Sequence, residues 1–173
     1  FIGGIMKSVD SFSAWFNPSL NSYDRLNART TNSGSTYSPT AVTYSGNNRT
    51  HMIRIPDSGR IEFRPADGAV NPYLLQAGLI AMGLDGIKNK RSPGKRIDIN
   101  MYSQGHKLKR IKKLPQSLTE SLNKFKASEV VKKSIGSKVV SQYVKLKKRE
   151  IAEHNKISDD DKKDWERKNI IDC

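Results

Sequence analysis

A four-residue turn between two short alternating segments is the feature of this sequence that most restricts its fold. The turn is Pro56-Asp57-Ser58-Gly59, and the segments on either side of it are residues 51–56 and 60–64. Alternation of apolar and polar side chains is typical of strands, and a turn containing proline and glycine joins neighbouring strands. The sequence therefore predicts a β-hairpin, and a third alternating segment at 40–45 extends this prediction to a small antiparallel sheet.

One helix is predicted before this sheet in the sequence, and another is predicted after it. Apolar residues recur at helical spacing over residues 2–16, and Asn17-Pro18 ends the pattern because a residue before proline avoids the helical region. Asn71 is placed to cap a helix that has Pro72 at its first position, and residues 73–90 are apolar almost all round until the last turns. We expect this second helix to be buried.

The sequence from residue 104 onwards is basic and is predicted to be helical. Ser117 to Glu120 has the pattern of a capping box, residues 137–154 have that of an amphipathic helix, and residues 158–161 start another helix. The expected fold class is therefore α+β, a partial antiparallel sheet with packed helices. Residues 27–38 are almost all Thr, Ser, Asn and Gly, which predicts a long exposed loop and a candidate flap.

The net charge of +14 is distributed unevenly and indicates an anionic partner for the first part of the chain. Residues 104–173 contain 19 Lys and Arg against 10 Asp and Glu, and their lysines follow helices, as expected for a solvent-exposed face. Residues 1–103 contain 12 against 7, mostly arginines in strand and loop segments. A nucleic-acid-binding module is the rival interpretation, but it predicts interleaved aromatic residues or a reading helix, and neither is evident. The predicted partners therefore include no nucleic acid.

The sequence favours a cytoplasmic protein without a membrane partner. No signal peptide is visible, and the longest apolar segment, residues 73–87, is too short to span a bilayer and contains Asp85. Cys173 is the single cysteine, so no disulfide can form within the chain. Because Phe1 opens the sequence inside an apolar periodic pattern, we also expect it to be part of a longer chain.

Five arginines lie on the predicted hairpin and beside it: Arg25, Arg49, Arg54, Arg60 and Arg64. Alternation puts Arg60, Glu62 and Arg64 on one face of the last strand. The plain alternative is a solvent-exposed edge strand whose charges pair with one another. A compact sheet would, however, gather like charges that repel by roughly 2 kcal/mol per pair at ~8 Å, and a ligand with phosphate and carboxylate groups would relieve this repulsion. Glu62, ionised among arginines, is the candidate ligand of Mg²⁺ or Mn²⁺.

Three motifs around these arginines resemble those of the glutamine synthetase family, namely NP-xx-NSY-x-RL, NRS followed by IRIP, and RIE-x-R followed by NPY. Their counterparts here are Asn17-Pro18-Ser19-Leu20-Asn21-Ser22-Tyr23-Asp24-Arg25-Leu26, then Asn48-Arg49-Thr50 with Ile53-Arg54-Ile55-Pro56, then Arg60-Ile61-Glu62-Phe63-Arg64 with Asn71-Pro72-Tyr73. The resemblance implies the carboxy-terminal part of a glutamine synthetase catalytic domain. Residues 1–103 would form its active-site sheet, flap and buried helix, residues 104–173 would form a helical basic tail, and the amino-terminal domain would be absent from this chain.

The resemblance also implies an activity and a role for each candidate residue. ATP would phosphorylate the side-chain carboxylate of glutamate, and ammonia would displace phosphate from the γ-glutamyl phosphate. Arg25 and Arg64 would bind glutamate, Arg49, Arg54 and Arg60 would bind ATP and the transferred phosphate, with Arg49 also catalytic, and Glu62 would bind the metal. Family members assemble as homo-oligomers of two rings. Since the family's other metal ligands would precede this chain, we expect the chain alone to be inactive.

One position departs from the family pattern and leaves the amine open. Members that use ammonium carry a glutamate in a GYEAP flap, and counting back from Arg49 gives Tyr37 at that place. Tyr37 is either inert packing or a catalytic-site residue whose ring holds a small alkylammonium by a cation–π contact of roughly 0.5 to 2 kcal/mol. The latter resembles the branch that includes glutamate methylamine ligases. Methylamine is therefore the alternative to ammonia, and a catalytically inactive paralogue is the third possibility.

Overall fold

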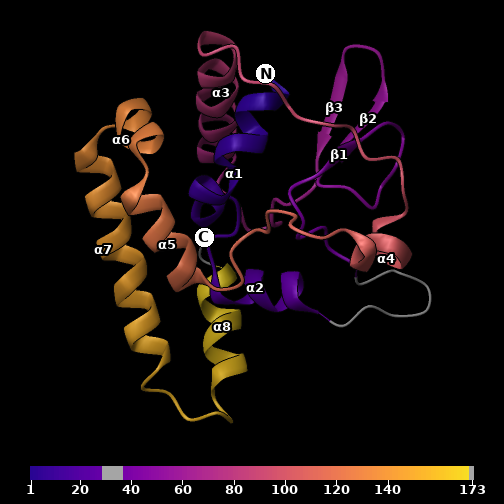
Figure 1. Ribbon diagram of the computed structural model, residues 1–173. Coiled ribbons are helices and arrows are strands. Elements are labelled where there is room, and N and C mark those ends of the chain that lie inside the picture. The colour runs from indigo at the N-terminus through magenta and orange to yellow at the C-terminus, as the bar shows by residue number, and fades with distance from the viewer. Residues whose placement is uncertain (29–36, 172–173) are drawn as a thin grey trace.

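The computed structural model describes residues 1–28 and 37–171, with side chains up to residue 169. A group of helices and a three-stranded sheet lie side by side (Figure 1). The elements are α1 (Ile2–Phe16), α2 (Leu20–Asn27), β1 (Tyr44–Ser45), β2 (Ile53–Asp57), β3 (Arg60–Phe63), α3 (Pro72–Lys88), α4 (Met101–Gln104), the 3-10 helix η1 (Gly105–Lys107), α5 (Leu118–Ala127), α6 (Glu129–Ile135), α7 (Ser137–His154) and α8 (Lys162–Ile171). The expected combination of a small sheet and packed helices is confirmed. The candidate flap falls mainly on residues 29–36, which lie outside the described residues.

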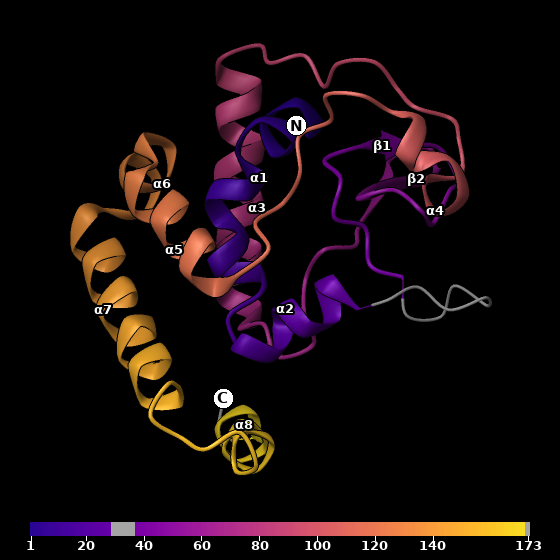
Figure 2. The same ribbon diagram turned by 60° about the horizontal axis from the view of Figure 1, so that its bottom comes forward.

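Helix α1 is the centre of the hydrophobic core. Helix α3 packs along one side of it and α5 along another (Figures 1 and 2). In its last two turns α1 buries Phe12, Trp15 and Phe16. The first two rings contact Phe125 of α5, and Phe16 contacts Phe63 of β3 with ring centroids 5.0 Å apart. The helix predicted from apolar spacing is therefore confirmed, and its buried side joins the helices to the sheet.

Two glycines allow α1 and α3 to approach closely. A Cβ atom built on Gly4 would lie 1.9 Å from the carbonyl oxygen of Met82, and one built on Gly86 would lie 2.5 Å from the nitrogen of Gly4. Both distances are far inside van der Waals contact, and both neighbouring atoms belong to the backbone. Only glycine fits at these positions unless the two helices separate.

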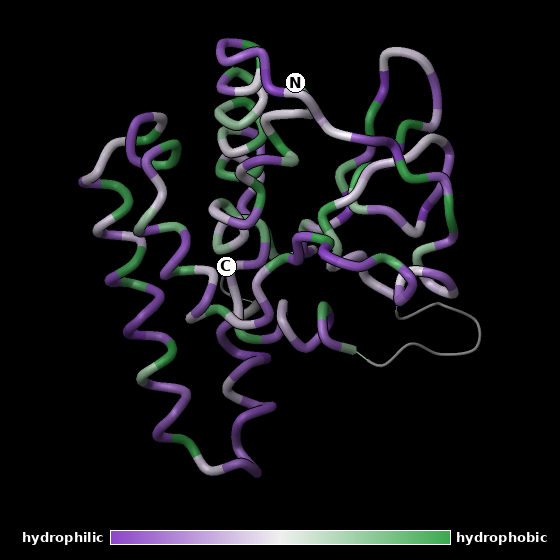
Figure 3. The backbone as a smooth tube through the Cα atoms, in the orientation of Figure 1, coloured by the Kyte–Doolittle hydropathy of each residue, from purple (hydrophilic) through white to green (hydrophobic). Residues whose placement is uncertain are grey.

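Only one side of α3 is buried, which corrects the expectation of a buried helix. Its glycines face α1, whereas Tyr73, Ile80, Leu84 and Ile87 are 80%, 53%, 57% and 58% exposed. Figure 3 shows apolar residues on successive turns of this helix. None of the described residues covers these four side chains. An all-round apolar sequence indicates what a helix can bury, but burial also requires an element on each side.

The predicted hairpin is confirmed, and one strand direction is corrected. Strands β2 and β3 pair antiparallel with Arg54 opposite Glu62, and Gly59 in the turn has a φ of 78°, which glycine adopts without strain. Strand β1 pairs with β2 in parallel, so the sheet is mixed rather than wholly antiparallel. The cause is the connection 46–52, whose successive turns return the chain to its original direction.

The basic part of the chain forms α5 to α8. Ser117 caps α5 by accepting a hydrogen bond from the backbone of Glu120, but the Glu120 carboxylate bonds to the backbone of Gln116, so only half of the predicted capping box forms. Helix α7 has the predicted limits, and α8 begins directly after the predicted start.

Helices α2 and α4 are not predicted from the sequence, whereas α6 lies in the basic part that is predicted to be helical without separate limits for this helix. A capping box between Ser19 and Ser22 starts α2, and the sequence pattern does not indicate it because the third helical residue is serine instead of the usual glutamate or glutamine. No described helix combines the length and apolar character that crossing a bilayer requires.

His51 is buried at the join between the sheet and the segment before α4. Its Nε2 donates to the carbonyl oxygen of Ile99 at 2.9 Å, since a carbonyl can only accept, and its Nδ1 accepts from the hydroxyl of Thr43 at 3.0 Å. Burial lowers the pKa of His51 below its ordinary 6.5, against the opposing effects of the Ile99 bond and of Asp98. The histidine is therefore structural and neutral in the folded state.

Replacing Gly4 with Ala should lower the free energy of unfolding by about 1–3 kcal/mol, because the added methyl group forces α1 and α3 apart. Gly68→Ala is the matched control, since a Cβ there meets nothing within 4 Å. Urea denaturation measures both variants. Equal stability of the two variants would contradict the proposed close contact.

The neutral His51 should make stability fall as the pH drops through 6.5. The unfolded chain takes up a proton at this position at a higher pH than the folded state does, so the free energy of unfolding decreases with decreasing pH. Unfolding measured from about pH 7 to about pH 5.5 should show a shallower decrease in His51→Gln than in the unchanged protein. The same slope in both proteins would show that another group is responsible.

Candidate active site

The carboxylate of Glu62 lies between two guanidinium groups on one face of the sheet. Its Oε2 accepts a hydrogen bond from Nη1 of Arg54 at 2.6 Å, and its Oε1 lies 3.0 Å from Nε of Arg64. The two-residue spacing of Glu62 and Arg64 places both on this face, as the alternation predicts, and cross-strand pairing brings Arg54 opposite Glu62. The Arg54 hydrogen bond and the charges of Arg54, Arg64 and Arg49 lower the pKa of Glu62, despite partial desolvation. Glu62 is therefore ionised at neutral pH.

The carboxylate of Glu62 pairs with two arginines, and the charge of a third, Arg49, also acts on it, so the cluster of these four residues is positively charged. Arg54 is held further by two hydrogen bonds from its Nε and Nη2 to the side chain of Asn47, at 2.8 and 2.5 Å. The Nη1 atom of Arg64 is buried and has no hydrogen-bond partner among the described residues. A buried donor without a partner costs about 1–3 kcal/mol, and guanidinium groups prefer carboxylates and phosphates. The cluster of Arg49, Arg54, Glu62 and Arg64 thus contains one buried donor that an anion would satisfy.

Arg25 and Arg60, which the sequence placed in the same site, lie outside this cluster. Arg60 pairs at 2.6 Å with Asp57 beside the hairpin turn, and both side chains are about two-thirds exposed. Arg25 donates to the side chains of Asp67, Ser38 and Asn17, at 3.2, 3.2 and 2.9 Å, and to the carbonyl oxygen of Pro65 at 2.7 Å. Arg25 therefore fastens α2 to the segments before β1 and after β3. The roles of Arg25 with glutamate and of Arg60 with ATP stay predictions.

Tyr37 lies beside the arginine cluster. Its hydroxyl donates to the carbonyl oxygen of Thr50 at 3.0 Å, and its ring meets that of Tyr102 edge to face with centroids 5.6 Å apart. Burial raises the pKa of Tyr37, and the charge of Arg64 acts in the opposite direction. The phenol is therefore protonated at neutral pH and is not a proton acceptor there.

The turn at residues 48–51 holds the site together through Asn48 and Thr50, for which the sequence predicts no role of their own. The side-chain oxygen of Asn48 accepts from the nitrogen and the hydroxyl of Thr50, at 3.0 and 2.7 Å. The Asn48 amide donates to Ile99, and the Thr50 hydroxyl accepts from the backbone of Met101, each 51 residues away in the sequence. An asparagine that bonds to the residue two positions later is a common turn pattern, so the bonds between Asn48 and Thr50 could be predicted from the sequence. The bonds to Ile99 and Met101 could not be predicted, because the sequence contains no pattern that relates these residues to the turn.

The described residues do not form a metal site by themselves. No group of three or more His, Cys, Asp or Glu side chains among them could hold a metal ion. Mg²⁺ takes about six oxygen ligands, whereas this face offers the carboxylate of Glu62, whose two oxygens already bond to arginines. The role of Glu62 as a metal ligand stays a prediction, and it would require ligands from outside the described residues.

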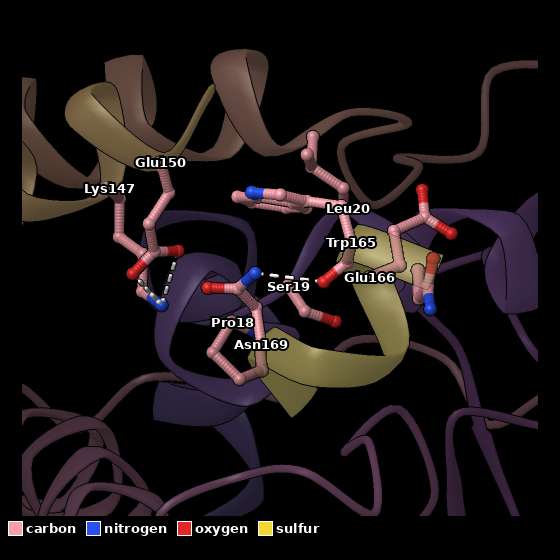
Figure 4. Close-up of a pocket in the computed structure, with 9 residues that line it drawn as sticks. Pro18, Ser19, Leu20, Lys147, Glu150, Trp165, Glu166 and Asn169 are labelled. Atoms are coloured by element: carbon pink, nitrogen blue, oxygen red, sulfur yellow. Dashed lines mark hydrogen bonds and ion pairs between the residues drawn. The ribbon is translucent and has the colours of Figure 1, made fainter. Parts of the chain in front are cut away.

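A hollow lies between α2, α7 and α8, away from the arginine cluster (Figure 4). Its volume is about 60 Å³, and Trp165 forms part of its wall. Lys147 pairs with Glu150 at 2.9 Å, and Glu166 lies 3.0 Å from His154. Because these charged groups are already paired with one another, the hollow offers few unpaired polar groups to a ligand. It marks the place where α8 packs against α2 and α7.

Comparison with known proteins identifies the relatives of this chain. Residues 1–169 match the family described as glutamine synthetase, catalytic domain. A glutamine synthetase from Rhizobium leguminosarum bv. phaseoli is 52% identical over 147 residues, which is 85% of this chain and 34% of that protein. A glutamate–methylamine ligase from Methyloversatilis universalis is 37% identical over 154 residues, again 34% of that protein. The chain spans about a third of the length of these curated relatives.

Two solved structures have the same fold over nearly the whole chain. GmaS in complex with ADP superposes with a TM-score of 0.83 at 43% identity, over 99% of this chain and 39% of that one. Apo GmaS superposes with a TM-score of 0.82 at 40% identity, over 99% and 37% of the two chains.

Replacing Arg25 with Ala should lower the free energy of unfolding by about 2–3 kcal/mol, because Asp67 and the buried Asn17 lose a charged partner. Arg60→Ala is the matched control, since it removes an exposed ion pair worth less than about 1 kcal/mol. Chemical denaturation distinguishes the two variants. If the free energy of unfolding falls no more in Arg25→Ala than in Arg60→Ala, the contacts of Arg25 do not stabilise the fold.

Proposed function

Since this chain belongs to the family of glutamine synthetase catalytic domains, we propose that it forms part of an ATP-dependent ligase that makes a side-chain amide of glutamate. The observation that carries the proposal is the buried, unpaired Nη1 of Arg64 beside the ionised Glu62. A carboxylate of glutamate is the anion assigned to this donor. Arg49 and Arg54 face the transferred phosphoryl group in the same proposal.

The proposed reaction has two steps. The terminal phosphoryl group of ATP passes to an oxygen of the glutamate side-chain carboxylate, and ADP leaves. The amine nitrogen then attacks the acyl carbon, the bond from that carbon to the phosphate oxygen breaks, phosphate leaves, and the nitrogen gives up a proton. Guanidinium groups fixed by Glu62 and Asn47 would stabilise the negative charge that develops, and fixed groups do so without reorganising during the reaction.

The cofactor and assembly are parts of the same proposal. ATP is supported by membership of the family and by the similarity to GmaS, which has been solved with ADP. Mg²⁺ or Mn²⁺ is assigned on the resemblance alone, with Glu62 as one ligand. A cytoplasmic homo-oligomer of two rings is proposed on the same ground.

Ammonia is the proposed amine, as the names of several relatives indicate, and methylamine is the second candidate. Tyr37 favours methylamine, because the resemblance implies that it stands where ammonium-using members have a carboxylate, and its ring lies against that of Tyr102. Similarity to GmaS and to a glutamate–methylamine ligase supports this candidate as well. A catalytically inactive paralogue is the remaining alternative, and only an activity measurement separates it from the two ligases.

An assay of ADP release by the complete natural protein tests the proposed activity. We expect release that requires glutamate together with ammonium or methylamine, because the acyl phosphate turns over only when an amine attacks it. Absence of glutamate-dependent release with both amines would refute the ligase. A hundredfold preference for ammonium would refute the second candidate.

Replacing Arg64 with Ala should raise the apparent KM for glutamate by about ten- to hundredfold, the effect of losing one charged hydrogen-bonding partner. The KM for ATP should change far less. Arg60→Ala is the comparison, since its predicted partner is ATP. Equal changes in both Michaelis constants for Arg64→Ala would remove its assigned role.

A further inference from the structure

Two tyrosines from distant parts of the sequence meet at right angles beside the arginine cluster. The rings of Tyr37 and Tyr102 are inclined at 88° with centroids 5.6 Å apart. Tyr102 belongs to α4, which lies next to the sheet in Figure 1. Both side chains are only partly buried, so each ring keeps accessible surface. Two perpendicular rings form a corner with more aromatic surface than Tyr37 alone provides.

Thr50 holds both rings in this arrangement. Its carbonyl oxygen accepts the hydrogen bond from Tyr37 at 3.0 Å, and its hydroxyl accepts from the backbone of Met101 at 2.9 Å. Asn100 caps the following turn by accepting from the nitrogen of Tyr102 at 2.9 Å. One residue of the turn that carries Arg49 thus fixes the distance between the two rings.

The positive charge of Arg64 disfavours binding of a cation at this corner until an anion neutralises it. Arg64 lies close enough to Tyr37 to influence its ionisation, so its guanidinium would repel an amine cation while its open donor is unpaired. A carboxylate bound at that donor would neutralise the repulsion. The positive amine is therefore expected after glutamate.

We propose that Tyr102 is a specificity-determining residue, and that with Tyr37 it forms an aromatic corner which binds methylammonium in preference to ammonium. Thr50 is the positioning residue of this corner. Aromatic faces attract alkylammonium cations through their quadrupole, whereas ammonium is held better by carboxylates and other hydrogen-bond acceptors. The inference rests on the proposed ligase activity with methylamine, the second candidate amine, as the substrate.

The test compares methylamine with ammonium as substrates of the complete natural protein, by ADP release at saturating glutamate and ATP. Tyr102→Leu keeps most of the side-chain volume but removes the ring. It should lower the ratio of kcat/KM for methylamine to kcat/KM for ammonium by about five- to tenfold, mainly through a higher KM for methylamine. Tyr102→Phe keeps the ring and should retain the ratio of the unchanged protein.

Thr50 provides an independent arm of this test. Thr50→Val removes the hydroxyl that holds Met101 but leaves the carbonyl that holds Tyr37, and it should lower the same ratio. Thr50→Ser restores the hydroxyl and should restore the ratio. A purely structural role of Thr50 would reduce activity with both amines equally.

The outcomes separate the inference from the function on which it rests. An active enzyme whose amine ratio is unchanged in Tyr102→Leu and in Thr50→Val would overturn the aromatic corner and leave the ligase intact. An equal loss with both amines would also overturn it. Absence of glutamate-dependent ADP release in the unchanged protein would instead refute the proposed function.

Discussion

The ion pairs of Glu62 with Arg54 and Arg64 are the interaction on which the arrangement of the site depends. Without a carboxylate between them, guanidinium groups on neighbouring strands would repel one another by roughly 2 kcal/mol per pair at ~8 Å. One carboxylate cannot neutralise three arginines, so the cluster remains positive and Arg64 keeps a buried donor without a partner among the described residues. The fold thus stabilises the arginines partially and leaves the remaining stabilisation to an anionic ligand.

The hairpin alone would not place this cluster beside the aromatic corner. The turn at residues 48–51 does so, because side-chain hydrogen bonds join it to Tyr37 near the end of the candidate flap and to the segment that leads into α4. The proposed anion site and the proposed amine site therefore share one short element. A shift of that element would change both the position of Arg49 and the spacing of the two rings. The amine preference and the binding of glutamate are accordingly expected to be coupled.

Local pattern was sufficient for the elements whose structure depends on neighbours in sequence. Alternation around the turn at Gly59 predicted the hairpin and the shared face of Glu62 and Arg64, which form an ion pair, whereas Arg60, predicted on the same face, pairs with Asp57 instead. The parallel direction of β1 could not be predicted, because it depends on the path of the connection 46–52. The one-sided burial of α3 could not be predicted either, because it depends on which elements pack around the helix. Arg25 shows the same limit in the site, since its contacts with Asp67 and Asn17 arise from tertiary packing.

The most direct test of the account is a crystal structure of the complete natural protein with ADP and glutamate bound. The account predicts a glutamate carboxylate oxygen about 2.7–3.2 Å from Nη1 of Arg64, with the ADP phosphates on the side of Arg49 and Arg54. It also predicts that Glu62 stays paired with Arg54. Glutamate bound elsewhere, with Nη1 of Arg64 still without an anion, would contradict the central claim that this cluster is an anion-binding site.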